Sequence, residues 1–164
     1  MIDLYHGKNA LIDHIEYDYA VQYNEGAQRQ RLVLRNDIAE KFVVPINATI
    51  GNKLQWLAGF LDADGCINTA STGTQTVQAA SIHKKFLIDV KLMCNTLGLN
   101  PKIKLNKGLG ELKEYDCKAI YRLLFHCTDT YKLYADLGLK TYRLTFNKVK
   151  GKRACAQYVR IKSV

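Results

Sequence analysis

The chain has 164 residues, which is enough to bury one hydrophobic core but leaves little room for a second domain. Hydrophobic residues account for 48% and charged residues for 24%, as in ordinary globular proteins, and no apolar run approaches the roughly 20 residues that span a bilayer. This composition excludes a membrane-spanning chain, and the net charge of +9 favours a polyanionic partner.

The N-terminus predicts an intracellular protein, because Met1 to His6 lack the charged lead and apolar stretch of a signal peptide. The sequence does not distinguish cytoplasm, nucleoid and organelle. Residues 16–23 and 31–34 are predicted to be extended, with a turn at residues 24–26. Asn36-Asp37 is expected to cap a short helix through Phe42.

Helix breakers then separate this segment from the rest of the chain. Pro45, Asn47 and Gly51 place a boundary near residues 46–52. Residues 1–50 are therefore assigned to an N-terminal extension without recognisable chemistry, and residues 51–164 to the functional domain with a basic C-terminal tail. The extension holds five Lys/Arg and seven Asp/Glu, whereas the domain holds nineteen and eight.

Apolar residues recur at helical spacing after the boundary. Leu54, Leu57, Ala58 and Leu61 fall on one helical face, and Gly65 is expected to end the helix as a C-terminal glycine. A second helix closes at Gly98, and a last one spans about residues 128–137.

Two stretches of alternating polarity predict β-hairpins. The first comprises residues 66–71 and 74–82, and the second joins 102–106 to 115–125 around a turn-rich segment at 107–110. The element order from residue 53 is therefore α-β-β-α-β-β-α. This order predicts an α+β fold with one antiparallel sheet and helices on one face, which leaves the other face free to bind a ligand.

The cysteines give no sign of a disulfide framework or a thiolate zinc site. They are five in number, widely separated and without a C-x-x-C pair, so we expect buried free thiols.

Two features of the first helix are costly for a plain core helix. Gly59 lies in its interior, which costs about 1 kcal/mol relative to alanine, and Asp62 and Asp64 oppose the helix dipole in its last turn. Both make sense if small residues let another helix approach closely while the helix end delivers an acid to a divalent cation, since Mg²⁺ prefers oxygen ligands.

Residues 57–65, Leu-Ala-Gly-Phe-Leu-Asp-Ala-Asp-Gly, resemble the motif that names the LAGLIDADG homing endonucleases, with differences only at Phe60 and Leu61. The order α-β-β-α-β-β-α is also that family's core unit, so the resemblance covers roughly residues 53–140. Val44-Pro45, Ser81-Ile82-His83 and Leu97-Gly98 further resemble the second endonuclease half found inside inteins.

The resemblance implies a site-specific double-strand DNA endonuclease that hydrolyses phosphodiester bonds with Mg²⁺, for which Mn²⁺ substitutes. Family members use two motifs, whose paired helices lie at the centre of a saddle-shaped DNA-binding sheet. Because one motif occurs here, the resemblance implies a homodimer on a long pseudo-palindromic site. The implied dimer-interface residues are Leu57, Ala58, Gly59 and Asp62.

The same resemblance implies roles for residues around the motif. Asp64 is the implied metal ligand, and the Ala63 carbonyl adds a contact. Lys140, just after the third helix, matches the place of an assisting lysine. His83 matches the polar residues that organise water around the scissile phosphate. Catalysis is therefore assigned to Asp64, Lys140 and His83.

DNA binding is expected on the free face of the sheet, because side chains of two hairpins fit the major groove, where base pairs are distinguishable. Residues 140–164 add eight Lys/Arg and no acid, which favours phosphate binding. The candidate DNA-binding residues are Asn68, Thr76, Gln78, Lys102, Lys104, Lys118, Arg122, Arg143 and Lys148.

Three alternatives stay open. An RNA maturase of the same fold would also be basic, because charge does not distinguish RNA from DNA. A non-catalytic DNA-binding protein would bind without cutting. Residues 1–50 would be the remnant of a first endonuclease half if the chain derives from an intein, although no terminal His-Asn is present, so no protein splicing is expected.

Overall fold

The computed structural model describes residues 2–16, 18–35, 42–107, 110–112, 115–147 and 149. From residue 50 onward its element order is the predicted one, with a short two-stranded ribbon added. The elements of this part are α1 (Ile50–Asp64), β4 (Gly65–Thr69), β5 (Gln75–Ser81), α2 (Lys84–Thr96), β6 (Lys102–Lys107), β7 (Gly110–Leu112), β8 (Tyr115–Cys117), β9 (Ile120–Phe125), α3 (Cys127–Tyr131) and a π-helical turn (Lys132–Asp136).

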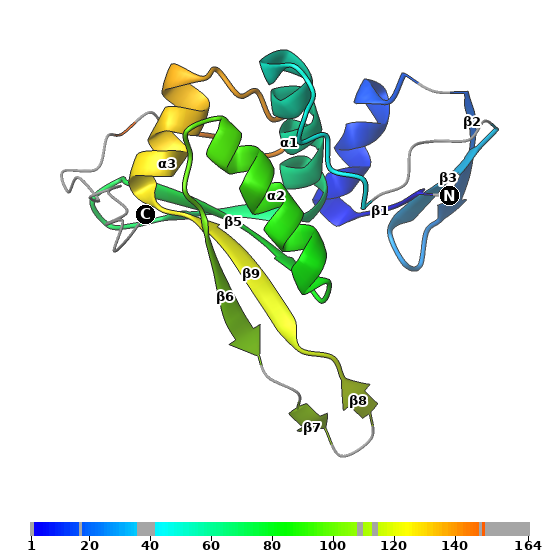
Figure 1. Cartoon of the computed structure of the whole chain (residues 1–164). Coiled ribbons are helices and arrows are strands. Elements are labelled where there is room, and N and C mark those ends of the chain that lie inside the picture. The colour runs from blue at the N-terminus through cyan, green and yellow to red at the C-terminus, as the bar shows by residue number, and fades with distance from the viewer. Residues whose placement is uncertain are drawn as a thin grey trace, which may run out of the picture.

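Strands β4, β5, β9 and β6 form one antiparallel sheet in that order, and Figure 1 shows α1, α2 and α3 gathered on one side of it. The predicted α+β fold with helices on one face is confirmed. Helix α1 begins where the boundary was predicted, with the Thr49 hydroxyl accepting a hydrogen bond from the Asn52 N–H at 3.3 Å.

The second hairpin differs from its prediction. Pairing of β6 with β9 becomes irregular between Leu105 and Lys107, and a separate ribbon of β7 and β8 follows. The predicted turn at 107–110 is therefore wrong, because Gly110 already belongs to a strand. Figure 1 shows this ribbon extending away from the helices.

The N-terminal extension forms a second small sheet, which Figure 1 places beside α1. Its outer strands β1 (Ile2–Tyr5) and β2 (Tyr19–Asn24) pair with the central β3 (Arg29–Leu34), so the two predicted strands are confirmed, whereas the turn lies at residues 25–28 and not at 24–26. A 3₁₀ helix at His6–His14 and β1 were not predicted. The helix predicted from Asn36 has its residues 36–41 outside the described part.

The core lies between the helices and the sheet. Residues that alternate along the central strands, such as Val77, Ala79, Leu123 and Phe125, are at most 2% exposed and pack against the helices. Their neighbours in the sequence point to the opposite face. The periodicity in the sequence therefore set which face of each strand is buried.

The described cysteines only partly match their prediction. Cys94, Cys127 and Cys66 are free thiols, and burial raises the pKa of Cys94 to about 12. Cys66 is exposed, so the expectation of burial is wrong there: it lies on the outer face of β4, where its Sγ accepts a hydrogen bond from Gln78 at 3.2 Å.

A buried acid makes the stability of this core depend on pH. Asp129 in α3 is 3% exposed, and burial raises the pKa of its carboxyl above the usual 3.8. The folded chain therefore holds this proton more tightly than the unfolded chain, so the associated stability is present below pH 3.8 and is lost as the pH rises through the raised value.

Asp129→Asn should therefore become more stabilising, relative to the parent chain, as the pH rises from about 4 to about 7. Thermal unfolding by circular dichroism at several pH values measures the difference in Tm. Asp136→Asn is the matched control, because Asp136 is exposed on the following turn. A pH-independent difference for Asp129→Asn would contradict the expected linkage.

Candidate functional site

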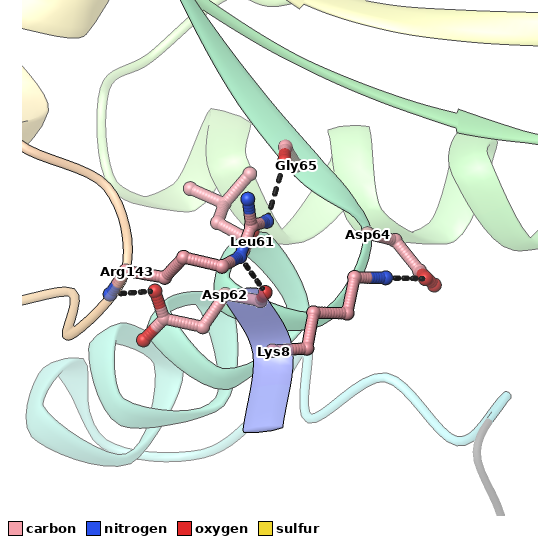
Figure 2. A network of polar contacts seen from close by, with 6 residues as sticks. All are labelled: Lys8, Leu61, Asp62, Asp64, Gly65 and Arg143. Carbon is pink, nitrogen blue, oxygen red and sulfur yellow. Dashed lines mark hydrogen bonds and ion pairs between the residues drawn. The ribbon is translucent and has the colours of Figure 1, made fainter. Parts of the chain in front are cut away.

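The last turn of α1 presents one carboxylate outward. The side chain of Asp64 is 32% exposed, and its Oδ1 lies 3.9 Å from Nζ of Lys8 in the N-terminal 3₁₀ helix (Figure 2). Ala63 beside it is exposed. No trio of His, Cys, Asp or Glu within the described residues could hold a metal by itself. One carboxylate still suits Mg²⁺, which commonly takes one or two from the protein and keeps waters or substrate phosphates.

Asp62, two residues earlier, has the opposite environment. It is 4% exposed, and its carboxylate accepts hydrogen bonds from the backbone N–H groups of Tyr142 at 2.8 Å and Arg143 at 2.9 Å. Both of its oxygens are used within its own chain, and its role at a dimer interface stays a prediction. Because a buried carboxylate must be hydrogen-bonded, Asp62 is fully committed to the segment after α3 of its own chain.

Arg143 was expected to bind DNA, and its guanidinium instead binds the end of α1. It donates to the backbone carbonyls of Asp62 at 2.6 Å, Gly65 at 2.6 Å and Leu61 at 3.1 Å. The reason is that the last carbonyls of a helix lack partners and form its negative pole. Arg143 therefore caps α1, and its role in DNA binding stays a prediction.

Gly65 also ends α1 differently from expectation. Its φ of −88° is not left-handed, and the chain passes directly into β4. A Cβ at this position would lie 2.5 Å from the Leu61 carbonyl oxygen, which explains the glycine by close backbone approach.

The expected dimer face of α1 is only partly available. Leu57 is fully buried in the core of its own chain, so in the single chain it presents no surface to a partner. Ala58 is half-buried, while Gly59 is exposed, and a Cβ added to Gly59 would meet no atom within 4 Å. Gly59 borders a cavity of about 590 Å³ between α1 and the N-terminal extension. That cavity is lined by Ile2, Asp3, Leu4, Lys8, Gln55, Trp56, Gly59, Phe60, Ala63, Asp64 and Phe86.

The two other proposed catalytic residues lie on different elements. Lys140 is exposed in the segment after the π-helical turn, between the buried Leu139 and the hydrogen-bonded Thr141. His83 is exposed at the start of α2, where its ring packs on Phe42 with centroids 4.6 Å apart. Their catalytic roles stay predictions.

The polar face of the sheet is built as the alternation predicted. Opposite partners share a face, and the register pairs Asn68 with Thr76 and Arg122 with Lys104. Gln78 and Lys102 are both opposite Leu124 of β9, so they lie on this face too. We call this set the sheet face: Asn68, Thr76, Gln78, Lys102, Lys104 and Arg122.

The remaining DNA-binding candidates stand apart from the sheet face. Lys118 is exposed in the link between β8 and β9. Lys148 lies outside the described residues. Asp64 immediately precedes β4 and is four residues before Asn68, so this acid lies where α1 enters the sheet that carries this face.

Sequence reasoning missed three groups near the site. Lys8, the ion-pair partner of Asp64, is not part of any motif. His14 stacks on Tyr142 with ring centroids 3.6 Å apart, and these two residues are far apart in the sequence. The buried Gln75 donates to the Thr145 carbonyl and accepts from the Asn147 N–H. Of these groups, only Gln75 could have been found in the sequence, because it is a polar residue at an inward-facing position of a strand.

Lys8→Ala should strengthen divalent-metal binding by about twofold to fivefold, because an ammonium 3.9 Å from Asp64 competes with a cation for that carboxylate. Isothermal titration with Mn²⁺ measures the change in Kd. Lys85→Ala is the control, since Lys85 pairs with Asp89 on α2 instead. Equal affinities for Lys8→Ala and the parent chain would show that the ion pair does not oppose metal binding.

Fold and site together define a two-hairpin α+β domain whose leading helix ends in a half-buried carboxylate beside a polar sheet face. The chain belongs to the family described as "LAGLIDADG-like domain", whose model matches residues 52–138, more than half of the sequence. Family members bind DNA. No described helix is long and apolar enough to cross a membrane.

A relative of known identity places a similar sequence within a much larger protein. The chain is 31% identical over 172 residues to the ribonucleoside-diphosphate reductase large subunit of Invertebrate iridescent virus 6. The match takes in 99% of this chain and 18% of that protein, so the chain spans less than a fifth of the relative's length.

Proposed function

We propose that the chain is a homing endonuclease that hydrolyses phosphodiester bonds in double-stranded DNA at a specific site, with a divalent metal. The observation that carries this proposal is the solvent-accessible, half-buried Asp64 carboxylate at the end of α1, next to the strand that begins the sheet face. Membership of a DNA-binding family adds support.

The residues of the centre have separate tasks in this proposal. Asp64, with the Ala63 carbonyl, would hold Mg²⁺ or Mn²⁺. A bound metal lowers the pKa of water and stabilises negative charge at a phosphate, so no protein nucleophile is needed. Lys140 would stabilise the phosphate charge, and His83 would orient water.

The sheet face would supply sequence recognition. Lys104 and Arg122 are directly opposite each other, and the exposed Lys102 is two residues from Lys104. Cations at the phosphates fix the position of the protein on DNA, whereas Asn68, Thr76 and Gln78 carry groups that hydrogen-bond base edges.

Double-strand cleavage needs two centres, and we propose that a second copy supplies the other. The face of α1 that remains for pairing contains the half-buried Ala58 and the exposed Gly59, without Leu57 or Asp62. The N-terminal residues that line the same cavity would have to share this face with the partner.

The relative suggests how such a domain is encoded. A nuclease-family segment that corresponds to 18% of a reductase subunit is best explained as an element inserted into a host protein. We infer that this chain derives from an intein endonuclease, in agreement with the motifs at Val44-Pro45 and Ser81-Ile82-His83.

The test is cleavage of a randomised-site DNA library by the purified chain with Mg²⁺ and with EDTA, followed by sequencing of the ends. Site-specific double-strand cuts that require metal support the proposal, and paired half-sites with near-twofold symmetry support the dimer. Binding without cutting would replace it with a non-catalytic DNA-binding protein. Selective binding to folded RNA would replace it with a maturase.

A further inference from the structure

We propose that Asp62 and Arg143 form a reciprocal clamp that positions Asp64 relative to the segment carrying Lys140, and that Arg143 is a positioning residue for cleavage. This inference rests on the proposed function. Figure 2 shows the arrangement: Arg143 reaches across the end of α1, while Asp64 points to the other side toward Lys8.

The first half of the clamp fixes the chain on both sides of Asp64. One guanidinium binds the carbonyls of Leu61 and Asp62 before it and of Gly65 after it, at 2.6–3.1 Å. The Ala63 carbonyl, the expected metal contact, is not among these acceptors. Arg143 therefore immobilises the turn without using either proposed ligand.

The second half runs in the opposite direction. Both oxygens of the Asp62 carboxylate are used, Oδ2 by the Tyr142 N–H and Oδ1 by the Arg143 N–H. Main-chain donors 80 and 81 residues away are thus bound by a side chain of the same turn. Because each partner binds the other's backbone, neither segment can shift alone.

The consequence concerns Lys140, three residues before Arg143. Its segment is held at one end by the Leu139 N–H bonded to the Leu133 carbonyl, and at the other by the clamp. Between them, the Thr141 hydroxyl donates to the Leu144 carbonyl at 2.7 Å. The clamp therefore sets where the two proposed catalytic side chains stand relative to each other.

Charge alone does not account for this arrangement. A lysine would preserve the cation at the negative end of α1, but its single ammonium cannot reproduce the planar fork that spans three carbonyls. Likewise, asparagine at position 62 keeps one acceptor oxygen but replaces the other by an NH₂ donor, which faces an N–H. Both substitutions test geometry while changing volume little.

The experiment compares Arg143→Lys and Asp62→Asn with the parent chain on its cleavage site. We expect kcat to fall on the order of 10²-fold, as for small misplacements of catalytic groups, while KM for DNA changes less than about twofold. Arg35→Lys is the matched control, because Arg35 also pairs with a carboxylate, Asp18 at 3.6 Å, and neither residue lines the cavity beside Asp64.

Mn²⁺ binding gives a readout that does not need cleavage. Arg143→Lys should weaken Asp64-dependent Mn²⁺ binding by about fivefold or more, measured by titration against Asp64→Asn as the blank. If both variants lose thermal stability but keep kcat and Mn²⁺ affinity, the clamp is structural only and the inference is overturned.

The two proposals fail differently. A parent chain that binds Mn²⁺ through Asp64 but cuts no DNA overturns the proposed function, while the Mn²⁺ titration still decides the clamp. A parent chain that neither cuts nor binds Mn²⁺ overturns both. Full rescue by Arg143→Lys would show that charge, and not the forked geometry, is what the centre needs.

Discussion

Asp64→Asn should reduce metal-dependent DNA cleavage by on the order of 10³-fold or more while leaving the fold unchanged. Asparagine has the same shape but no negative charge, so the end of α1 would lose its attraction for a divalent cation. The measurement is single-turnover cleavage of the site recovered from the library, with Mg²⁺ titrated from limiting to saturating concentrations.

The Asp64→Asn substitution should have little effect on the stability of the fold. The side chain of Asp64 is 32% exposed, and its ion pair with Lys8 at 3.9 Å is partly solvated and therefore of small energetic value. The free energy of unfolding should therefore change by no more than about 1 kcal/mol. Asp136→Asn is the control for loss of one exposed carboxylate. Unchanged cleavage by Asp64→Asn would remove this residue from the catalytic centre.

Local pattern was sufficient for the elements that form the site. The apolar spacing of Leu54, Leu57 and Leu61 predicted α1, and strand alternation predicted which side chains share the sheet face. Both signals come from residues within a few positions of each other, so they depend little on tertiary context. Asp64 could accordingly be placed at a helix end before the structure was known.

The same local pattern did not predict contacts between residues that are far apart in the sequence. Arg143 joins α1 across 81 residues, and in the sequence it is one of many cations in a basic tail. The missed signal was in Asp62: it follows Leu54 and Ala58 at intervals of four, so it falls on the core-facing side of α1. A buried acid requires a hydrogen-bond partner. Helical periodicity could therefore have predicted that Asp62 has such a partner, but not which residue it is.

The N-terminal extension was underpredicted for a related reason. Its 3₁₀ helix has no buried residue and hence no apolar periodicity to reveal it. Contacts such as Lys8 with Asp64 depend on how the extension lies against α1. The position of the N-terminal extension against α1 therefore determines the surroundings of Asp64. It also determines how much of the α1 surface is available to a second copy of the chain.

Gly65→Ala should destabilise the chain by about 1–3 kcal/mol and lower cleavage, because the new Cβ would lie 2.5 Å from the Leu61 carbonyl oxygen. That neighbour is backbone in the turn that carries Asp64, and it also accepts from Arg143, so relief of the clash displaces the centre. Urea unfolding and single-turnover cleavage measure the two effects. A Gly65→Ala chain as stable as the parent would contradict the close approach.

Gly59→Ala is the matched control in the same helix, and it tests the proposed homodimer. A Cβ at position 59 meets nothing within 4 Å in the single chain, so removing a mid-helix glycine should stabilise the fold by about 1 kcal/mol. If a second copy packs closely on this face, the same methyl group must weaken self-association. Sedimentation of a more stable but more monomeric variant would support pairing through α1, whereas unchanged association would locate the partner elsewhere.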